Sequence, residues 1–257
     1  MPFDFNRPLI FVAHPDDETI ACGGLLQRMT ESQVVIATDG APPHYGFKRR
    51  FGTLEKYSTV RFQEAARALG YVPNCSIHRL AKPDGSYFVD QHLFRDLDWA
   101  LGSLCKIARA FSPDALLCHA YEGGHIDHDT CSFIAMHCAA ALSLRRFEFP
   151  LYWEDENGKS TVQQFRDGGA VPVEWSLTAS EVACKEKMLG EYKSQALAST
   201  FPSSPERIRA VTCTDFSKAH CRHYSYRDWW RTRLSSKVLL KKLAQFDAVR
   251  QSRESRP

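Results

Sequence analysis

The stretch LIFVAHPDDETIACGG, Leu9–Gly24, decides the fold, because an apolar run ends abruptly in a cluster of charge. The run Leu9–Ala13 predicts a buried β-strand, and the small residues that follow predict a helix over 19–30. Carboxylates crowded at the end of a buried strand repel one another and lose hydration, so something must offset their cost. A bound cation does so, and so does a solvated helix N-terminus. The clustered side chains are His14, Asp16, Asp17 and Glu18.

The composition of the chain is that of a globular protein. Its 257 residues are 44% hydrophobic and 25% charged, which suits one large α/β domain spanning 1–257. The N-terminal stretch lacks a charged segment followed by a long apolar run, so we expect a cytoplasmic protein without a transmembrane segment. The nine cysteines include no Cys-x-x-Cys pair and lie mostly in apolar segments, which predicts buried, reduced thiols.

The net charge of +3 is unevenly distributed along the chain. Residues 227–257 carry nine Lys or Arg and three Asp or Glu, which is +6 there and −3 for the rest. A basic helical extension of this kind suits peripheral contact with an anionic membrane surface, nucleic acid or an acidic partner, and it also suits a solvated helix that binds nothing. The sequence contains no nucleic-acid-binding motif, so we expect no nucleic-acid partner. It is compatible with a homo-oligomer.

Short apolar segments alternate with helical patterns through the first two-thirds of the chain. Strands are expected within 8–13, 33–40, 76–85 and 114–124, and helices at 19–30, 55–69, 91–110 and 129–144. This alternation predicts βαβ units, and hence a Rossmann-like three-layer α/β sandwich with a mainly parallel central sheet. Further strands around a turn at Asn157–Gly158 and a helix at 180–195 complete the same domain. Ligands bind beyond the carboxyl ends of such strands, where the polar clusters lie.

A second cluster, HIDH at 125–128, follows the fourth expected strand. With His14 and Asp17 it supplies the two imidazoles and one carboxylate that are typical of a catalytic zinc site with one position left for water. Asp16, beside one ligand, would then stay ionised off the metal and accept a proton. Each cluster alone also suits a solvated loop or a helix cap. The two together, each at a strand end, favour the metal site.

These motifs resemble a known family. AHPDDE (13–18) followed by H-x-D-H (125–128) looks like the PIG-L/LmbE-like family of zinc-dependent N-deacetylases, which act on N-acetylglucosamine-type groups. The resemblance extends over about residues 8–210 in order and spacing. Its further segments are ACGGLL (21–26), ATDG (37–40), R-x-x-E (61–64), PDG (83–85), Y-x-S-Q (192–195) and E-R-x-R (206–209).

The resemblance implies a division of roles. His14, Asp17 and His128 would bind Zn²⁺, and Asp16 would be the general base that takes a proton from the attacking water and returns it to the leaving amine. His125 would stabilise the oxyanion of the tetrahedral intermediate.

The resemblance also implies supporting roles. Asp127 would orient His125 by hydrogen bonding, and Glu18 would brace the loop. Ile126 stands where the family usually has proline, which bears on the placement of His125. Arg61 and Asp84 match positions that contact the sugar, and two further residues lie beside the metal loop. The expected substrate contacts are Arg61, Asp84, Tyr121 and Glu122.

The sequence therefore predicts a zinc-dependent hydrolase that removes acetyl from an N-acetylated amino-sugar conjugate and yields a free amine and acetate. One alternative is the same mechanism acting on another small amide, such as a thiol conjugate or an antibiotic. Another is a non-catalytic Rossmann-like protein that binds a metal or ligand, although a pure binder has no need of Asp16 as a base. No G-x-G-x-x-G follows the first strand, which disfavours a nucleotide-dependent oxidoreductase.

Overall fold

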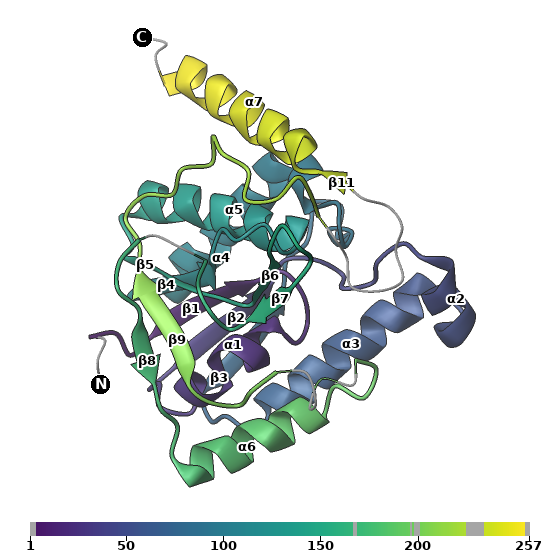
Figure 1. Ribbon diagram of the computed structural model, residues 1–257, viewed down its shortest axis with the longest axis vertical. Helices are drawn as coiled ribbons and strands as arrows, with labels where there is room; N and C mark the ends of the chain where they lie inside the picture. The colour runs from purple at the N-terminus through teal and green to yellow at the C-terminus, as the bar shows by residue number, and fades with distance from the viewer. Residues whose placement is uncertain (1–3, 167–168, 196, 198–200, 225–233, 255–257) are drawn as a thin grey trace.

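A seven-stranded sheet forms the centre of the computed structural model, which describes residues 4–166, 169–195, 197, 201–224 and 234–254 (Figure 1). The strand order is β3-β2-β1-β4-β5-β9-β8. The first five of these strands are parallel, and β9 is antiparallel to both β5 and β8, so the predicted mainly parallel sheet is confirmed. The strands are β1 (Pro8–Val12), β2 (Ser32–Ile36), β3 (Cys75–Arg79), β4 (Ala115–His119), β5 (Arg146–Phe149), β8 (Val173–Trp175) and β9 (Glu206–Ala210).

Helices cover both faces of this sheet, because its central strands are apolar on both sides. In β1, Leu9 and Phe11 enter one core, and Ile10 and Val12 enter the other. Helices α1, α3 and α6 pack on the second of these faces, and α4, α5 and α7 on the first, giving the predicted three-layer sandwich (Figure 1). The helices are α1 (Asp17–Leu26), α2 (Tyr45–Phe51), α3 (Leu54–Leu69), α4 (Leu97–Phe111), α5 (Ile126–Leu142), α6 (Ala179–Gly190) and α7 (Ser236–Glu254).

Three helix boundaries differ from the expected ones in ways that affect the site. Helix α1 begins at Asp17 and α5 at Ile126, two and three residues earlier than expected, so both start inside the polar clusters. The expected helix over 91–110 is a short 3₁₀ turn, η1 (Leu93–Arg95), followed by α4. Residues 89–92 form a loop instead, because their backbone groups bond to carboxylates from other segments.

The smaller elements lie around the sheet. Strands β6 (Tyr152–Glu154) and β7 (Ser160–Val162) form a hairpin around the turn predicted at Asn157–Gly158, and β10 (His223–Tyr224) pairs with β11 (Leu234–Ser235). Helix α7 is the main part of the predicted basic extension, and it buries Leu239, Leu243 and Phe246 in the core beside α5. Residues 227–233 and 255–257 of that extension lie outside the described residues. Among the described helices, none has the length and apolar character needed to cross a membrane.

The topology places two loops side by side. The chain leaves β1 toward β2 and β3, and leaves β4 toward β5, on opposite sides of the β1–β4 pair. The carboxyl ends of β1 and β4 therefore flank the point where strand order reverses, which is where ligands bind in sheets of this kind. The residues after β1 begin the AHPDDE motif, and the residues after β4 lead into HIDH.

Candidate metal centre

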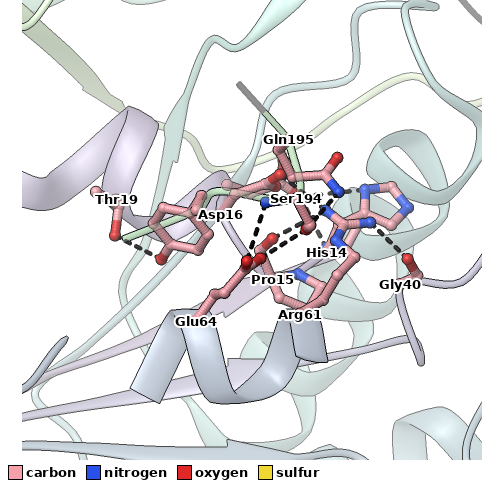
Figure 2. A network of polar contacts seen from close by, with 12 residues as sticks. His14, Pro15, Asp16, Thr19, Gly40, Arg61, Glu64, Ser194 and Gln195 are labelled. Atoms are coloured by element: carbon pink, nitrogen blue, oxygen red, sulfur yellow. Dashed lines mark hydrogen bonds and ion pairs between the residues drawn. The ribbon is translucent and has the colours of Figure 1, made fainter. Parts of the chain in front are cut away.

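The loop after β1 is strained at Asp16. This residue has a φ of 134°, a conformation that residues with a side chain rarely adopt. The guanidinium of Arg61 donates to the carbonyl of Pro15 (2.9 Å) and to Asp16 Oδ2 (2.8 Å). From the other side, the N–H of Asp16 donates to Glu18 Oε2 (3.1 Å). Two buried charged side chains thus hold the strained residue in place. Figure 2 shows one of them, Arg61, beside Pro15 and Asp16.

Glu18 braces this loop from the core. Its carboxylate is fully buried and accepts hydrogen bonds from the hydroxyl of Tyr192 and from Thr19 Oγ1 (3.2 Å). Burial raises the pKa of Glu18, and the bond from Tyr192 opposes that rise. Glu18 therefore links the segment after α6 to the start of α1.

The same segment after α6 is joined to α3. Ser194 donates to Glu64 through its N–H (2.9 Å) and its Oγ (2.6 Å), and Gln195 Nε2 donates to the hydroxyl of Tyr57 (2.5 Å). Figure 2 shows Glu64 and Arg61 on α3 with Ser194 and Gln195 facing them. The Y-x-S-Q motif thus fixes the helix that supplies Arg61.

Asp17 lies at metal-ligand spacing from two buried histidines, one after β1 and one after β4. Asp17 Oδ2 is 3.4 Å from His14 Nδ1 and 3.5 Å from His128 Nε2. Ligand atoms held tetrahedrally at zinc-ligand bond lengths are about 3.3–3.6 Å apart. The possible ligand atoms of His14, His125 and His128 also lie within 4.8 Å of one another. The three predicted zinc ligands are therefore brought together.

His128 lacks the partners that a buried imidazole needs. It is 3% exposed, and neither of its ring nitrogens has a hydrogen-bond partner among the described residues. Burial, with the neighbouring His119, lowers the pKa of His128 to about 3, so the ring is neutral and keeps a lone pair. A metal ion satisfies such a nitrogen. The residues present therefore fit a metal.

A fourth candidate ligand, His119, is less suitable. Its Nε2 is 3.3 Å from Asp17 Oδ2, and Asp17, His119 and His128 form one group at metal-binding distances. However, the N–H of Ala13 donates to His119 Nε2 (3.0 Å), which occupies the lone pair that faces Asp17. His119 is therefore a less suitable ligand than His128, whose ring nitrogens have no such donor among the described residues.

The charges around the site also call for a cation. Burial raises the pKa of Asp16 to about 7, although Arg61 opposes the rise. Burial lowers the pKa of His14, but the carboxylates of Asp90, Asp127 and Asp17 outweigh it and hold that pKa well above its usual value. Four buried carboxylates, those of Asp16, Asp17, Asp90 and Asp127, thus lie around one imidazole and one guanidinium. A divalent ion would offset this excess of negative charge.

His125 forms the N-cap of α5. Its Nδ1 accepts the N–H of Asp127 (3.1 Å), and burial together with the neighbouring His14 and His128 holds its pKa well below the usual value. A neutral imidazole that accepts at Nδ1 carries its proton on Nε2. The N-cap bond therefore leaves Nε2–H of His125 as the group that donates a hydrogen bond.

The carboxylate of Asp127 has a different partner from the expected one. It accepts the N–H of Gln91 (2.5 Å) and of Leu93 (3.2 Å), and its Oδ2 lies 3.4 Å from His14 Nε2. Its link to His125 runs through the backbone N–H that caps the helix. The Asp127 carboxylate is thus placed to orient His14, one of the predicted ligands, and its backbone N–H contacts His125.

The expected substrate contacts lie in different settings. Arg61 is buried against Asp16, and Glu122 is buried with its Oε2 accepting a backbone N–H in the segment before β6. Tyr121 donates its hydroxyl to a backbone carbonyl near residue 218 (2.8 Å). Asp84 lies in an exposed turn, where its carboxylate accepts the hydroxyl of Ser86 (2.6 Å). Their contact with substrate stays a prediction.

The sequence did not single out Asp90 or Tyr152. Asp90 is 3% exposed, and its Oδ1 lies 3.4 Å from His14 Nε2. Tyr152, at the start of β6, places its ring edge against His128 with the centroids 5.2 Å apart. Asp90 precedes a helical pattern, so its only sequence signal was that of a helix cap. Tyr152 gave none beyond its place in a predicted strand.

Comparison with known proteins places the chain in a family. Residues 9–139, more than half of the chain, match the family model PIG-L, described as GlcNAc-PI de-N-acetylase. Among curated protein sequences, none matches the chain.

Several solved structures share the fold. A deacetylase of the teicoplanin biosynthetic pathway, solved as a triple mutant, is 18% identical with a TM-score of 0.60, over 79% of this chain and 97% of that one. N,N'-diacetylchitobiose deacetylase from Pyrococcus horikoshii is 16% identical with a TM-score of 0.54, over 81% of this chain and 85% of that one. GalB, the 4-carboxy-2-hydroxymuconate hydratase from Pseudomonas putida, is 15% identical with a TM-score of 0.56, over 82% of this chain and 98% of that one. Proteins with this fold thus catalyse different reactions, so the fold alone does not identify the reaction. The match to the family model contains both clusters of the site, and the chain belongs to the PIG-L family.

Proposed function

We propose that this protein is a zinc-dependent N-deacetylase acting on an N-acetylated amino-sugar conjugate. The observation that carries the proposal is His128, a buried neutral imidazole without a hydrogen-bond partner among the described residues, 3.5 Å from the carboxylate of Asp17. Membership of the PIG-L family supports the reaction, and the deacetylases among the similar structures are consistent with it.

His14, Asp17 and His128 would hold the ion. Two imidazoles and one carboxylate form a ligand set typical of catalytic zinc, and an all-oxygen set would be needed to favour magnesium or calcium. When bound, the ion supplies Lewis acidity to the amide carbonyl and activates the attacking water.

Asp16 is placed to move the proton. It is buried beside the ligands but bonded to Arg61 at 2.8 Å, so its carboxylate stays off the metal. Burial raises the pKa of Asp16 to about 7, and a carboxylate with a pKa near neutrality can accept a proton from the nucleophile and deliver it to the leaving amine. Arg61 fixes its direction, because the same guanidinium also bonds to the carbonyls of Pro15 and Gly40.

His125 is placed to stabilise negative charge on the substrate oxygen. Its Nδ1 is occupied by the N-cap bond, so the proton on Nε2 is the one it offers. A neutral imidazole donor does not lose its proton when an oxyanion develops beside it. The cap of α5 therefore serves both the fold and the proposed reaction.

The test combines metal analysis with an amine-release assay. We expect about one zinc per chain and release of free amine from at least one member of a panel of N-acetylglucosamine conjugates with lipid, thiol-precursor, nucleotide and antibiotic aglycones. Asp16→Asn should retain zinc and lose about 10²–10⁴-fold in kcat. The matched control is Asp98→Asn, a surface carboxylate on α4 that is 67% exposed.

Two results would reject the proposal. One is a purified chain that holds no zinc and takes none up when zinc is added. The other is an Asp16→Asn variant that turns over substrate as fast as the unsubstituted chain. Amine release only from substrates without a sugar would change the proposed function to a general small-amide hydrolase of the same mechanism.

A further inference from the structure

Asp90 is a buried carboxylate aimed at a proposed metal ligand. Its Oδ1 lies 3.4 Å from His14 Nε2, and its Oδ2 lies 4.0 Å from Arg61 Nη1. The side chain is 3% exposed, and Oδ1 has no hydrogen-bond donor among the described residues. A buried anionic oxygen is costly unless a proton donor or a cation faces it. The group that faces this oxygen is the imidazole of His14.

A second carboxylate faces the same nitrogen. Asp127 Oδ2 lies 3.4 Å from His14 Nε2, while the other ring nitrogen, Nδ1, lies 3.4 Å from the ligand Asp17. The ring of His14 is therefore oriented with Nδ1 toward the ligands and Nε2 toward two carboxylates. If the lone pair of Nδ1 binds a metal, the remaining ring proton lies on Nε2, between these two carboxylates.

The loop of residues 89–92 positions the carboxylates of both Asp90 and Asp127. Residues 89–92 contribute Asp90 itself, and the N–H of Gln91 donates to Asp127 at 2.5 Å. Gln91 has a φ of 67°, a left-handed conformation that a residue with a side chain keeps only when its surroundings enforce it. The N–H of Asp90 donates to Asp39 Oδ1 (3.0 Å), which ties this loop to the end of β2.

We infer that Asp90, together with Asp127, holds His14 in the tautomer and orientation that bind the metal, so that Asp90 is a positioning residue that sets metal affinity. The inference rests on the proposed function for the identity of the ligand. Metal-binding histidines usually donate their second ring N–H to a carboxylate, and loss of that partner weakens metal binding about 10–100-fold. Asp84, which the sequence predicts as a substrate contact, lies in an exposed turn and bonds to Ser86 instead.

The test measures zinc affinity directly, by competition of the purified chain with a chromophoric chelator. Asp90→Asn should bind one zinc about 10–100-fold more weakly than the unsubstituted chain. The melting temperature of the metal-free chain is measured alongside, to separate a loss of zinc affinity from a loss of folding. Asp84→Asn is the matched control and should leave zinc affinity unchanged. If Asp90→Asn does not fold, Asp90→Ser is measured in its place with the same expectation.

Several results would overturn the inference. Unchanged zinc affinity in Asp90→Asn, in a chain that binds zinc and releases amine, would reject Asp90 as a positioning residue and leave the proposed function standing. Loss of one of two bound zinc ions, with the first bound as tightly as before, would show that Asp90 is a ligand of a second ion instead. A chain that binds no zinc would reject both proposals.

Discussion

Replacement of Lys185 by methionine should destabilise the protein, because Lys185 belongs to an ion pair buried beneath α1. Its Nζ lies 2.7 Å from Glu206 Oε1 and donates to the carbonyl of Ile20 (2.8 Å). Glu206 also accepts the N–H groups of Gly24 (2.7 Å) and Leu25 (2.8 Å). Both charged side chains are 0% exposed. The methionine would keep most of the volume and leave Glu206 as a buried carboxylate without its cation.

The expected loss of stability in Lys185→Met follows from the free-energy cost of a buried charge without a partner. Removing one partner of a buried ion pair costs about 3–5 kcal/mol, and we expect the lower end because two N–H donors remain on Glu206. For a chain of this size, that corresponds to a fall in melting temperature of about 6–20 °C. Urea unfolding should show a lower midpoint with the same dependence on denaturant. The double variant Lys185→Met/Glu206→Gln should recover much of the loss, because it leaves no buried charge.

An exposed pair provides the control for this experiment. Arg67 lies 3.1 Å from Glu191 with its side chain 52% exposed, so Arg67→Met should cost less than about 1 kcal/mol. A loss below 1 kcal/mol in Lys185→Met, or a double variant no more stable than the single one, would refute the reasoning. Either result would mean that water or rearrangement compensates Glu206, and that the pair does not hold α1 in place.

Two further predictions concern glycines and pH. Gly24→Ala should lower the free energy of unfolding, measured in urea titrations, by about 1–3 kcal/mol, because the added Cβ would clash with the Leu177 side chain. Gly102→Ala, whose Cβ would meet nothing within 4 Å, should raise it by up to about 1 kcal/mol, and equal effects of the two substitutions would contradict this reasoning. Burial raises the pKa of Asp39 to about 6, so the folded state holds its proton more tightly than the unfolded state, and the stability this contributes is present near pH 4 and lost as pH rises to 6. Asp39→Asn should therefore gain up to about 3 kcal/mol relative to the unsubstituted chain between pH 4 and pH 7, and a pH-independent difference would exclude Asp39 as the source.

Strands β1 to β4 could be predicted because they are short apolar runs separated by helical patterns, a signal that each segment carries by itself. Strands β5 and β9 were not predicted, because charged residues interrupt their apolar ones. Helix boundaries were less predictable. Helix α5 begins at Ile126 because His125 caps it through Nδ1, and histidine is not among the residues that usually mark a helix start. The apolar pattern that located this helix begins only after the polar residues, so it placed the start three residues late.

The proposed ligands could be predicted because two short motifs carry them, and parallel topology brings both motifs to one edge of the sheet. Their supports could not. Tyr192 reaches Glu18 across 174 positions of sequence, and Asp90 reaches His14 through a loop whose shape depends on bonds to Asp39 and to the Asp127 carboxylate. A single carboxylate before a helical pattern has the same sequence signal whether it caps that helix or enters a buried site.

The strain at Asp16 can be understood from the adjacent proposed ligand, Asp17. In the proposed site, Asp17 binds the ion and Asp16 accepts a proton, so the two adjacent carboxylates must point in different directions. The backbone therefore turns sharply between Asp16 and Asp17. A φ of 134° achieves this turn at a cost of about 1–3 kcal/mol, and glycine would adopt it without that cost. Glycine would lack the carboxylate, however. The bonds from Arg61 to Asp16 and from the Asp16 N–H to Glu18 offset the strain, so the chain keeps an unfavourable conformation where the proposed proton transfer requires a side chain.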